Sequence, residues 1–209
     1  MTILIHPTYF PNIAHFAAFV QADSIAFEIC DSYQKQTYRN RTQIATANGK
    51  IALSVPLKFS QKNRQLFKDV RIASDEKWQS HHWKSLQSAY KTSPFFEYYE
   101  DDLAPLFHLP YEFIMDFNFK CMEVVLECLQ YEKVYSSTST FEKSPTQIKD
   151  LRFLTKVRKE QSYQFEAYTQ VFSTKNGFLT NLSILDLLFN EGPNAINYLQ
   201  NQPLDFLLT

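Results

Sequence analysis

Apolar and polar positions near the N-terminus are arranged as two short strand-like runs with a helical stretch between them. Residues 2–5 and 24–30 are apolar runs of strand length. Two prolines within residues 6–11 predict an extended turn, and Asn12 can cap a helix over residues 13–21. A strand, a helix and a second strand in this order usually form a parallel unit, so we expect a βαβ opening.

Residues 42–56 have the pattern of a β-hairpin. Asn48-Gly49 is a favoured pair for a two-residue type I′ turn, and a register centred on it places Ile44 opposite Leu53. One face of the hairpin is then mostly apolar. Another strand is expected over residues 68–72, where Val70 and Ile72 alternate with charged residues.

From residue 74 onward the apolar spacing becomes mainly helical. Four helices are expected over residues 74–90, 94–106, 112–129 and 144–158; Ser74 or Asp75 caps the first, and Pro105 breaks the second. A fifth helix begins at Ser183, which forms a capping box with Asp186. A last helix begins at Pro193. Gly192 is expected to end the helix that Ser183 begins, and residues 133–138 are expected to form a strand.

These patterns predict one α/β domain over residues 1–209. Its first part, residues 1–73, combines the βαβ opening and the hairpin in a mixed sheet. Its second part, residues 74–209, is mainly helical. A hydrophobic fraction of 44% is enough for a sizeable core, and the 19 Phe and 12 Tyr predict that much of this core consists of aromatic rings.

Composition also narrows the classes of function. The chain has only 3 Gly, and neither a Walker A loop nor a GxGxxG turn occurs in it, which excludes the usual glycine-rich phosphate loops. A net charge of −1 gives no basic surplus for nucleic acid. No apolar run reaches the ~18 residues of a membrane span, and no signal-peptide pattern is present, so we expect a cytoplasmic protein whose three cysteines are free thiols.

The most informative polar stretch lies between two strand-like runs, at residues 31–41. Six of its eleven residues supply a carboxylate, two amides and three cations, namely Asp31, Gln34, Lys35, Arg39, Asn40 and Arg41. Arginine binds carboxylate or phosphate as a fork and lysine as a point charge, so the stretch suits an anionic or sugar-like ligand. A solvated loop with local ion pairs, each worth ~0–1 kcal/mol, is the alternative.

Histidines and cysteines supply further candidates. His6 and His15 stand where nucleotidyl-transferring α/β folds meet phosphate near a helix N-terminus, although the simpler reading is a partly buried His6 and a surface His15. His81 and His82 are adjacent on a helix and have no third ligand at metal spacing, so no metal site is expected. Cys30 precedes Asp31 but has no partner histidine at a recognisable spacing, which favours a structural role.

Several motifs together resemble the WbqC-like protein family. They are His-Pro-Thr-Tyr-Phe-Pro at 6–11, Gln-Ala-Asp at 21–23, Asp-x-x-Gln-Lys…Asn-Arg-x-x-Ile at 31–44, Asn-Gly…Leu-x-Val-Pro at 48–56, Trp78…Tyr90…Pro94-Phe95-Phe96…Tyr99, and Leu-Ser-Ile-Leu-Asp-Leu-Leu-Phe-Asn-x-Gly at 182–192. The resemblance covers most of the chain. It departs from the family at His6, where members often have Gln, and in residues 136–167, which are shorter and lack a Ser-Gly stretch.

The resemblance implies a transferase of bacterial surface-polysaccharide (O-antigen) biosynthesis. Its substrate would be an amino-sugar or sugar-nucleotide precursor, modified by acyl or aminoacyl transfer. In that reading Lys35, Arg39 and Arg41 bind the anionic part of the ligand, His6 or Asp31 is the base, Gln34 and Asn40 orient hydroxyl or amide groups, and Tyr9 completes the binding set. No cofactor follows from the sequence, and the expected partner is a small sugar or nucleotide.

Two other functions remain open from the sequence. His6, His15 and the βαβ opening also fit a nucleotide-binding or nucleotidyltransferase-like protein. Ring-rich helices would alternatively suit a non-catalytic scaffold in a polysaccharide-assembly complex, which would expose a large apolar patch.

Overall fold

A computed structural model describes residues 1–58, 65–73, 77–158 and 162–204. Its central feature is a four-stranded parallel sheet made of β1 (Thr2–Ile5), β2 (Ser24–Phe27), β7 (Tyr135–Ser137) and β8 (Lys149–Asp150). The strand order is β7-β2-β1-β8. Helix α1 (Ile13–Gln21) connects β1 to β2, which confirms the βαβ opening.

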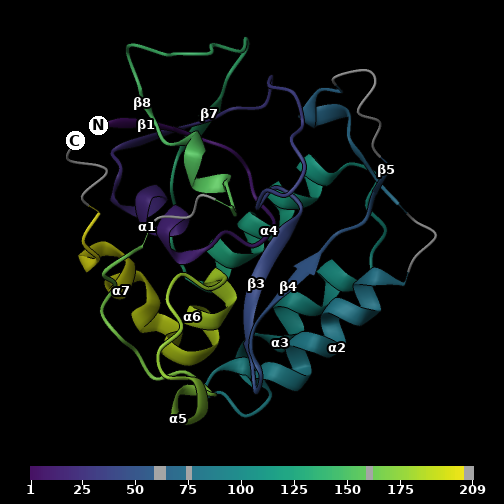
Figure 1. The fold of residues 1–209 in the computed structure, drawn as a ribbon, viewed down its shortest axis with the longest axis vertical. Coiled ribbons are helices and arrows are strands. Elements are labelled where there is room, and N and C mark those ends of the chain that lie inside the picture. The colour runs from purple at the N-terminus through teal and green to yellow at the C-terminus, as the bar shows by residue number, and fades with distance from the viewer. Residues whose placement is uncertain (59–64, 74–76, 159–161, 205–209) are drawn as a thin grey trace.

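Helix α1 lies against the sheet and is buried almost all round. Residues 13–20 are all buried, as expected of a helix that is apolar on every side. The Asn12 side chain accepts a hydrogen bond from the His15 backbone N–H, so the predicted cap is confirmed. Near the other side of α1 lie α6 (Ile184–Glu191) and α7 (Ala195–Asn201), so the C-terminal helices shield the N-terminal unit (Figure 1).

The hairpin forms a sheet of its own. Strands β3 (Arg41–Thr46) and β4 (Gly49–Ser54) pair with each other and, among the described residues, with no strand of the parallel sheet, so the single mixed sheet was wrong. The hairpin packs instead against α6 and against α2, at the centre of Figure 1. A second small pair, β5 (Leu57–Lys58) and β6 (Arg71–Ile72), is also separate.

The predicted hairpin register is wrong by two residues. Ile44 faces Ile51, and Thr46 faces Gly49, so the connecting residues are Ala47 and Asn48. A type I′ turn needs two central residues with positive φ, but only Gly49, with φ of 98°, has it. Gly49 therefore occupies the position after the two-residue turn, and the strand pairing shifts by two residues.

Three helices of the second half agree with the sequence pattern. They are α2 (Trp78–Tyr90), α3 (Phe96–Leu103) and α4 (Ile114–Cys128). The expected break at Pro105 appears as a 3₁₀ helix over Ala104–Phe107. The proposed caps Ser74 and Asp75 lie outside the described residues. The strand predicted over 68–72 is shorter, because a 3₁₀ helix at Phe67–Asp69 precedes β6.

The helix predicted over residues 144–158 is wrong. That segment contains β8 and a 3₁₀ helix at Arg152–Thr155, and Pro145 stands near its start. The backbone of β8 pairs with β1, and the Leu151 N–H donates to the Leu4 carbonyl. Sheet pairing in three dimensions therefore overrides a weak local helical pattern, and the second half supplies two of the four parallel strands.

The C-terminal part contains the short helix α5 (Ser173–Asn176), α6, a 3₁₀ turn at Gly192–Asn194 and α7. Ser183 caps α6 through the Leu185 N–H, and Gly192, with φ of 52°, ends it as predicted. Asp186 does not complete a capping box. Its buried carboxylate accepts hydrogen bonds from Tyr90 and Tyr168 and thereby joins α2 to the C-terminal segment.

The buried apolar residues form one continuous core. It extends from Ile3 in β1 to Leu204 after α7 and includes side chains of every α-helix longer than one turn. Aromatic pairs are frequent in it, for example Tyr90 with Phe189 and Trp83 with Phe107. No helix among the described residues combines the length and apolar character of a membrane span.

Candidate functional site

The strand order creates a crevice at one edge of the parallel sheet. Because all four strands are parallel, their carboxyl ends meet at this edge. β2 lies on one side of β1 and β8 on the other, and ligands of open α/β sheets bind where the strand order reverses in this way. His6 follows β1 directly, and Asp150 ends β8.

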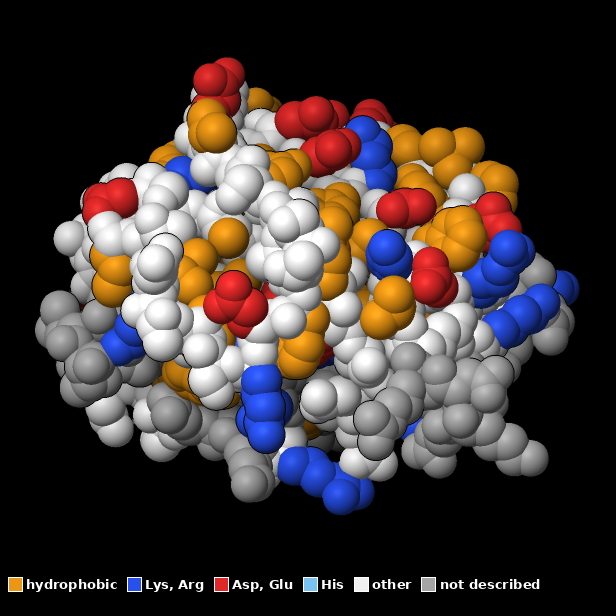
Figure 2. All heavy atoms as spheres, turned by 90° about the horizontal axis from the view of Figure 1, so that it is seen from above, with side chains coloured by type: hydrophobic (Ala, Val, Ile, Leu, Met, Phe, Trp, Pro, Cys, Tyr) orange, Lys and Arg blue, Asp and Glu red, His pale blue; other side chains and the backbone are white. Residues whose placement is uncertain are grey.

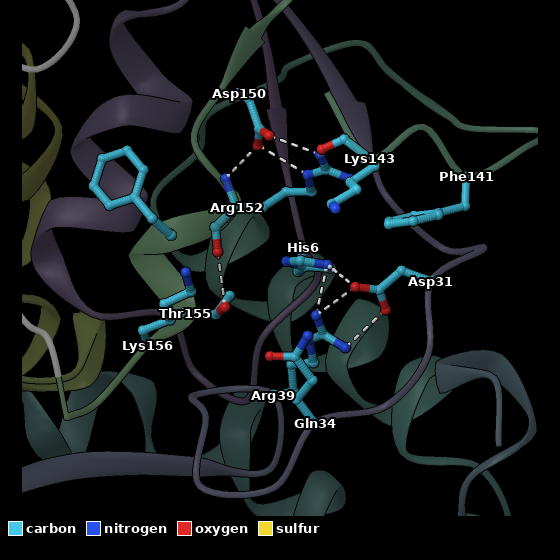
Figure 3. Close-up of a pocket in the computed structure, with 11 residues that line it drawn as sticks. His6, Asp31, Gln34, Arg39, Phe141, Lys143, Asp150, Arg152, Thr155 and Lys156 are labelled. Carbon is cyan, nitrogen blue, oxygen red and sulfur yellow. Dashed lines mark hydrogen bonds and ion pairs between the residues drawn. The ribbon is translucent and has the colours of Figure 1, made fainter. Parts of the chain in front are cut away.

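A cavity of about 400 Å³ lies at this place. Its volume is within the range of small-molecule sites. It is lined by His6, Asp31, Gln34, Arg39, Phe141, Lys143, Asp150, Arg152, Phe153, Thr155 and Lys156 (Figure 3).

One wall is a buried cluster of His6, Asp31 and Arg39. Two nitrogens of the Arg39 guanidinium donate to the two oxygens of the Asp31 carboxylate, at 2.9 and 2.8 Å. Arg39 Nη2 also lies 2.7 Å from His6 Nε2, and Asp31 Oδ2 lies 3.0 Å from the same nitrogen. Arg39 is only 2% exposed, so this fork holds its charge away from water.

The contacts decide which nitrogen of His6 carries the proton. A guanidinium has only donors, so in the shorter, 2.7 Å contact Nε2 of His6 accepts from Arg39, and the same nitrogen cannot then donate to Asp31. Burial, reinforced by the Arg39 charge, lowers the His6 pKa to about 4, and the ring is neutral at pH 7. The single ring proton is therefore on Nδ1. The Arg39 guanidinium, and not a histidine proton, holds the Asp31 carboxylate near Nε2.

Nδ1 of His6 is buried and has no hydrogen-bond partner within the described part of the chain. In Figure 3 the ring edge that carries it faces away from Asp31, toward the side of Arg152 and Thr155. A buried donor without a partner costs ~1–3 kcal/mol, and such a donor beside a cavity is well placed to bind an acceptor atom of a ligand.

The opposite wall is built around Arg152. Its Nε and Nη2 donate to Asp150 at 2.8 and 2.6 Å, and its Nη1 donates to Glu28 at 3.2 Å. Glu28 follows β2 and is itself bound by the Cys30 backbone N–H. The Arg152 guanidinium lies over the ring of Phe141, 5.3 Å from its centroid. These contacts lower the Asp150 pKa against the effect of burial and fix the guanidinium in place.

Positive charge exceeds negative charge on the cavity walls. Four basic side chains, Arg39, Lys143, Arg152 and Lys156, face two carboxylates, Asp31 and Asp150. Both carboxylates are engaged by arginines. Lys143 and Lys156 are exposed at the cavity, where their ammonium groups can approach a ligand. The arrangement is suited to phosphate or carboxylate.

Three loops are fastened together to form this site. His15 Nε2 donates to the His6 carbonyl at 3.0 Å. The buried side chain of Asn118 in α4 donates to the carbonyls of Pro7 and Arg39. The Tyr38 N–H donates to the Thr155 carbonyl at 2.8 Å, which joins the polar segment to the loop after β8. None of these links is a local contact in sequence.

Half of the eight predicted site residues line the cavity. His6, Asp31, Gln34 and Arg39 do so, and the other four point elsewhere. Lys35 is exposed outside the cavity, and Tyr9 is fully buried with its hydroxyl 2.9 Å from His82 Nδ1.

Asn40 and Arg41 also leave the cavity. Asn40 donates to the Val55 carbonyl and accepts from Tyr33, so it links the polar segment to the hairpin. Arg41 is the first residue of β3 and pairs with Ser54.

The sequence pattern did not indicate the wall formed by residues 141–156. Arg152 and Lys156 lie in a segment predicted to be a helix, and their proximity to His6 depends on the unexpected pairing of β8 with β1. A cluster of charges at Lys149, Asp150 and Arg152 was the only local signal.

His15 does not occupy a phosphate site. The first N–H groups of α1 are already bound, that of Ile13 by the Leu182 carbonyl, that of Ala14 by Asn181 and that of His15 by Asn12. His15 itself is buried, not on the surface, and burial lowers its pKa to about 4. A helix N-terminus binds phosphate only through free donors.

No metal site emerges from the part of the chain that the structure describes. There, no three His, Cys, Asp or Glu side chains are grouped as ligands. His82 is buried between Trp78 and Tyr9 and points away from the cavity. The Cys30 thiol donates to the Thr138 carbonyl, consistent with a structural role.

Comparison with known proteins gives a consistent picture. The chain is 22% identical to "Uncharacterized protein Rv1507c" of Mycobacterium tuberculosis, over 92% of this chain and 91% of that protein. No solved structure matches the chain significantly. The model of the WbqC-like protein family matches residues 6–166 and, in a second segment, 155–198. These matches cover most of the sequence, including His6, the polar segment and the wall after β8, and the chain belongs to the WbqC-like protein family.

Proposed function

We propose that the cavity at the carboxyl ends of β1 and β8 binds an anionic, sugar-derived precursor and transfers an acyl or aminoacyl group to its amine. The observation that carries this proposal is the buried, unpartnered Nδ1–H of His6 beside a cavity with an excess of positive charge. The setting would be cytoplasmic synthesis of a bacterial surface polysaccharide, as the family resemblance implies.

In the proposed reaction the amine nitrogen attacks the acyl carbonyl carbon. A C–N bond forms, the bond from the acyl carbon to its carrier breaks, and the proton lost by the amine leaves with the carrier. Negative charge develops on the carbonyl oxygen in between, and a neutral imidazole donor aimed at that oxygen stabilises it. His6 Nδ1 takes this role in place of the base suggested by the sequence.

In this mechanism Asp31 positions other residues and does not itself react. Both of its oxygens accept from Arg39, whose positive charge lowers the Asp31 pKa despite burial, so Asp31 is neither free nor basic enough to accept the proton readily. Its role is to hold Arg39, and Arg39 in turn fixes the ring of His6. Lys143, Lys156 and Arg152 would bind the anionic part of the precursor.

The binding part of the proposal is tested by a thermal-shift panel. Nucleotides, nucleotide-linked amino sugars, amino-sugar phosphates and acyl-coenzyme A donors are each added to the wild type and to Lys156→Ala. A ligand at a hundredfold excess over its Kd stabilises the wild type by ~2.7 kcal/mol. We expect Lys156→Ala to reduce the shift produced by one ligand class. Lys68→Ala, an exposed lysine outside the cavity, is the matched control.

The variant Arg41→Ala distinguishes the proposed cavity from the ligand site expected from the sequence, which included Arg41. Because Arg41 does not line the cavity, its removal should leave the ligand-induced shift in place. A shift lost in Arg41→Ala but kept in Lys156→Ala would contradict the proposed location.

The chemical part needs a ligand pair from this panel. Mass spectrometry would detect an acylated amino sugar formed from the amine and the acyl donor that bind. His6→Gln keeps a side-chain donor and should retain part of the rate, whereas His6→Leu should lower kcat about 100-fold or more, the loss known for removal of one oxyanion donor. Equal kcat in the wild type and His6→Leu would refute the role of His6.

The structure favours this function over its rivals. The nucleotidyltransferase-like alternative required free donors at the start of α1, and those donors are occupied. The scaffold alternative required a large apolar patch. On the face that Figure 2 shows, apolar side chains are interspersed with charged and uncharged polar ones, and exposed large hydrophobics such as Ile51 in β4, Tyr98 in α3 and Val134 before β7 lie in separate parts of the chain.

A further inference from the structure

Phe141 is an aromatic side chain whose position the core does not explain. It is 50% exposed, in the connection between β7 and β8, and it lines the cavity. The two residues after it line different cavities: Lys143 lines this cavity, and Glu142 lines a second one. Figure 3 shows the Phe141 ring beside Lys143, on the Asp31 side of His6.

Phe141 is held from one side by a fixed cation. The Arg152 guanidinium lies 5.3 Å from its ring centroid, and Asp150 and Glu28 hold that guanidinium by hydrogen bonds. The side chain of Arg152 is only 10% exposed, so the contact belongs to the wall and not to the solvent. Because Phe141 is half-exposed although the guanidinium lies against it, its ring also offers surface on which a flat ring can stack.

Three cations besides Arg39 line the same cavity as Phe141. Lys143 follows Phe141 by two residues, Arg152 lies over the ring, and Lys156 lies on the far side of Thr155 at the same cavity. Lysines bind phosphate as point charges, and the Arg152 guanidinium, whose fork is occupied by Asp150 and Glu28, adds its positive charge beside them. An aromatic platform and several cations in one cavity match a ligand that carries a base and a diphosphate.

We propose that the precursor bound here is a nucleoside diphosphate derivative, whose base stacks on Phe141 while its phosphates contact Lys143, Arg152 and Lys156. This rests on the proposed function and specifies its substrate class. It assigns Phe141 as the residue by which the protein distinguishes a nucleotide-linked precursor from a simple sugar phosphate.

Isothermal titration calorimetry of the full chain tests this inference with three probes, UDP, ADP and inorganic pyrophosphate. We expect at least one of the nucleoside diphosphates to bind at least about fivefold more tightly than pyrophosphate, the lower bound of one stacked base. Phe141→Ala should remove that preference and leave pyrophosphate binding unchanged. Phe141→Trp should keep it, and nucleotide should change the fluorescence of the new indole.

Tyr98→Ala is the matched control, because Tyr98 is a 70% exposed ring in α3 that does not line the cavity. Equal affinities for pyrophosphate and both nucleotides, no binding of either nucleotide, or an equal loss of all three in Phe141→Ala would overturn the inference. Glucosamine 1-phosphate separates the two proposals. If it binds with dependence on Lys156 while nucleotides bind no better, the proposed function stands and the nucleotide assignment fails.

Discussion

At the scale of single residues, the site is defined by buried polar groups that constrain one another. Arg39 engages both oxygens of Asp31, and its Nη2, which binds one of them, also contacts His6. A charge removed from water in this way persists only with its partner beside it. The composition of residues 31–41 predicted a ligand-binding segment, but the sequence could not show that Arg39 and Asp31 bind each other.

Loss of Arg39 should therefore destabilise the whole protein. Arg39→Met leaves the Asp31 carboxylate buried without its partner, and we expect a loss of about 3–5 kcal/mol in the free energy of unfolding, measured by urea denaturation. The double variant Arg39→Met/Asp31→Leu should recover much of this loss. Arg158→Met, at an exposed arginine, should change stability by no more than about 0.5 kcal/mol. A double variant as unstable as the sum of the two single ones would contradict this coupling.

Buried histidines should make stability fall in weak acid. Burial lowers the pKa of His6, His15 and His82 from 6.5 to about 4. Between these values the unfolded chain binds protons that the folded chain excludes, so stability is full above pH 6.5 and decreases as the pH falls toward 4. Each histidine contributes up to about 1.4 kcal/mol per pH unit.

The variant His15→Gln isolates one of these contributions. Glutamine keeps a donor for the His6 carbonyl but cannot be protonated. Between pH 7 and pH 5 we expect its unfolding free energy, measured in urea, to decrease less than that of the wild type. If the unfolding free energies of the two proteins decreased equally between these pH values, His15 would have the same pKa in the folded and the unfolded chain, which would contradict this prediction.

At the scale of elements, the sequence was informative wherever a pattern was local and long. Helix α4 and the βαβ opening follow from apolar spacing and caps. The wrong predictions share one cause, which is pairing between residues that are far apart in the sequence. Strand β8 has only two residues and exists because it pairs with β1, so its segment was assigned to a helix. With it the wall that contains Arg152 and Lys156 was missed.

The end of α6 offers a local test of packing. A Cβ added at Gly192 would lie 2.6 Å from the Phe95 ring, and the φ of 52° disfavours any side chain there. Gly177 has a φ of 68° but open space around it. Both glycines combine a positive φ with a negative ψ, at −167° in Gly177 and −126° in Gly192, which side chains rarely adopt, so both Gly→Ala variants should lose about 1–3 kcal/mol from backbone strain. Gly192→Ala should lose a further 1–3 kcal/mol, roughly, from overpacking in urea denaturation. Equal losses would mean that Phe95 moves aside freely.

At the scale of the whole molecule, one continuous core connects the N-terminal unit with the C-terminal helices. The Leu-Ser-Ile-Leu-Asp motif belongs to this core and not to the cavity. Asp186 within it is fully buried and accepts hydrogen bonds from Tyr90, Tyr168 and Gln170. The residues that carry the family resemblance thus divide into a group that builds the fold and a smaller group, with His6, Asp31 and Arg39, that builds the cavity.

This division explains why the family was easier to identify than the site. Half of the predicted site residues do not line the cavity, and two of these, Asn40 and Tyr9, have hydrogen-bond partners within the fold. A motif read along the chain does not distinguish a residue that binds a ligand from one that holds the neighbouring loop. Only the meeting of the strand ends of β1, β2 and β8 makes that distinction.

The most direct measurement is nitrogen-15 NMR of the histidine rings at pH 7, without ligand and with pyrophosphate or UDP. The account predicts a neutral His6 ring with its proton on Nδ1, whose Nδ1 resonance shifts on addition of the anion while the ring resonances of His15 and His82 stay in place. A His6 ring that carries its proton on Nε2, or that does not respond to either anion, would contradict the claim that this cavity is the ligand site.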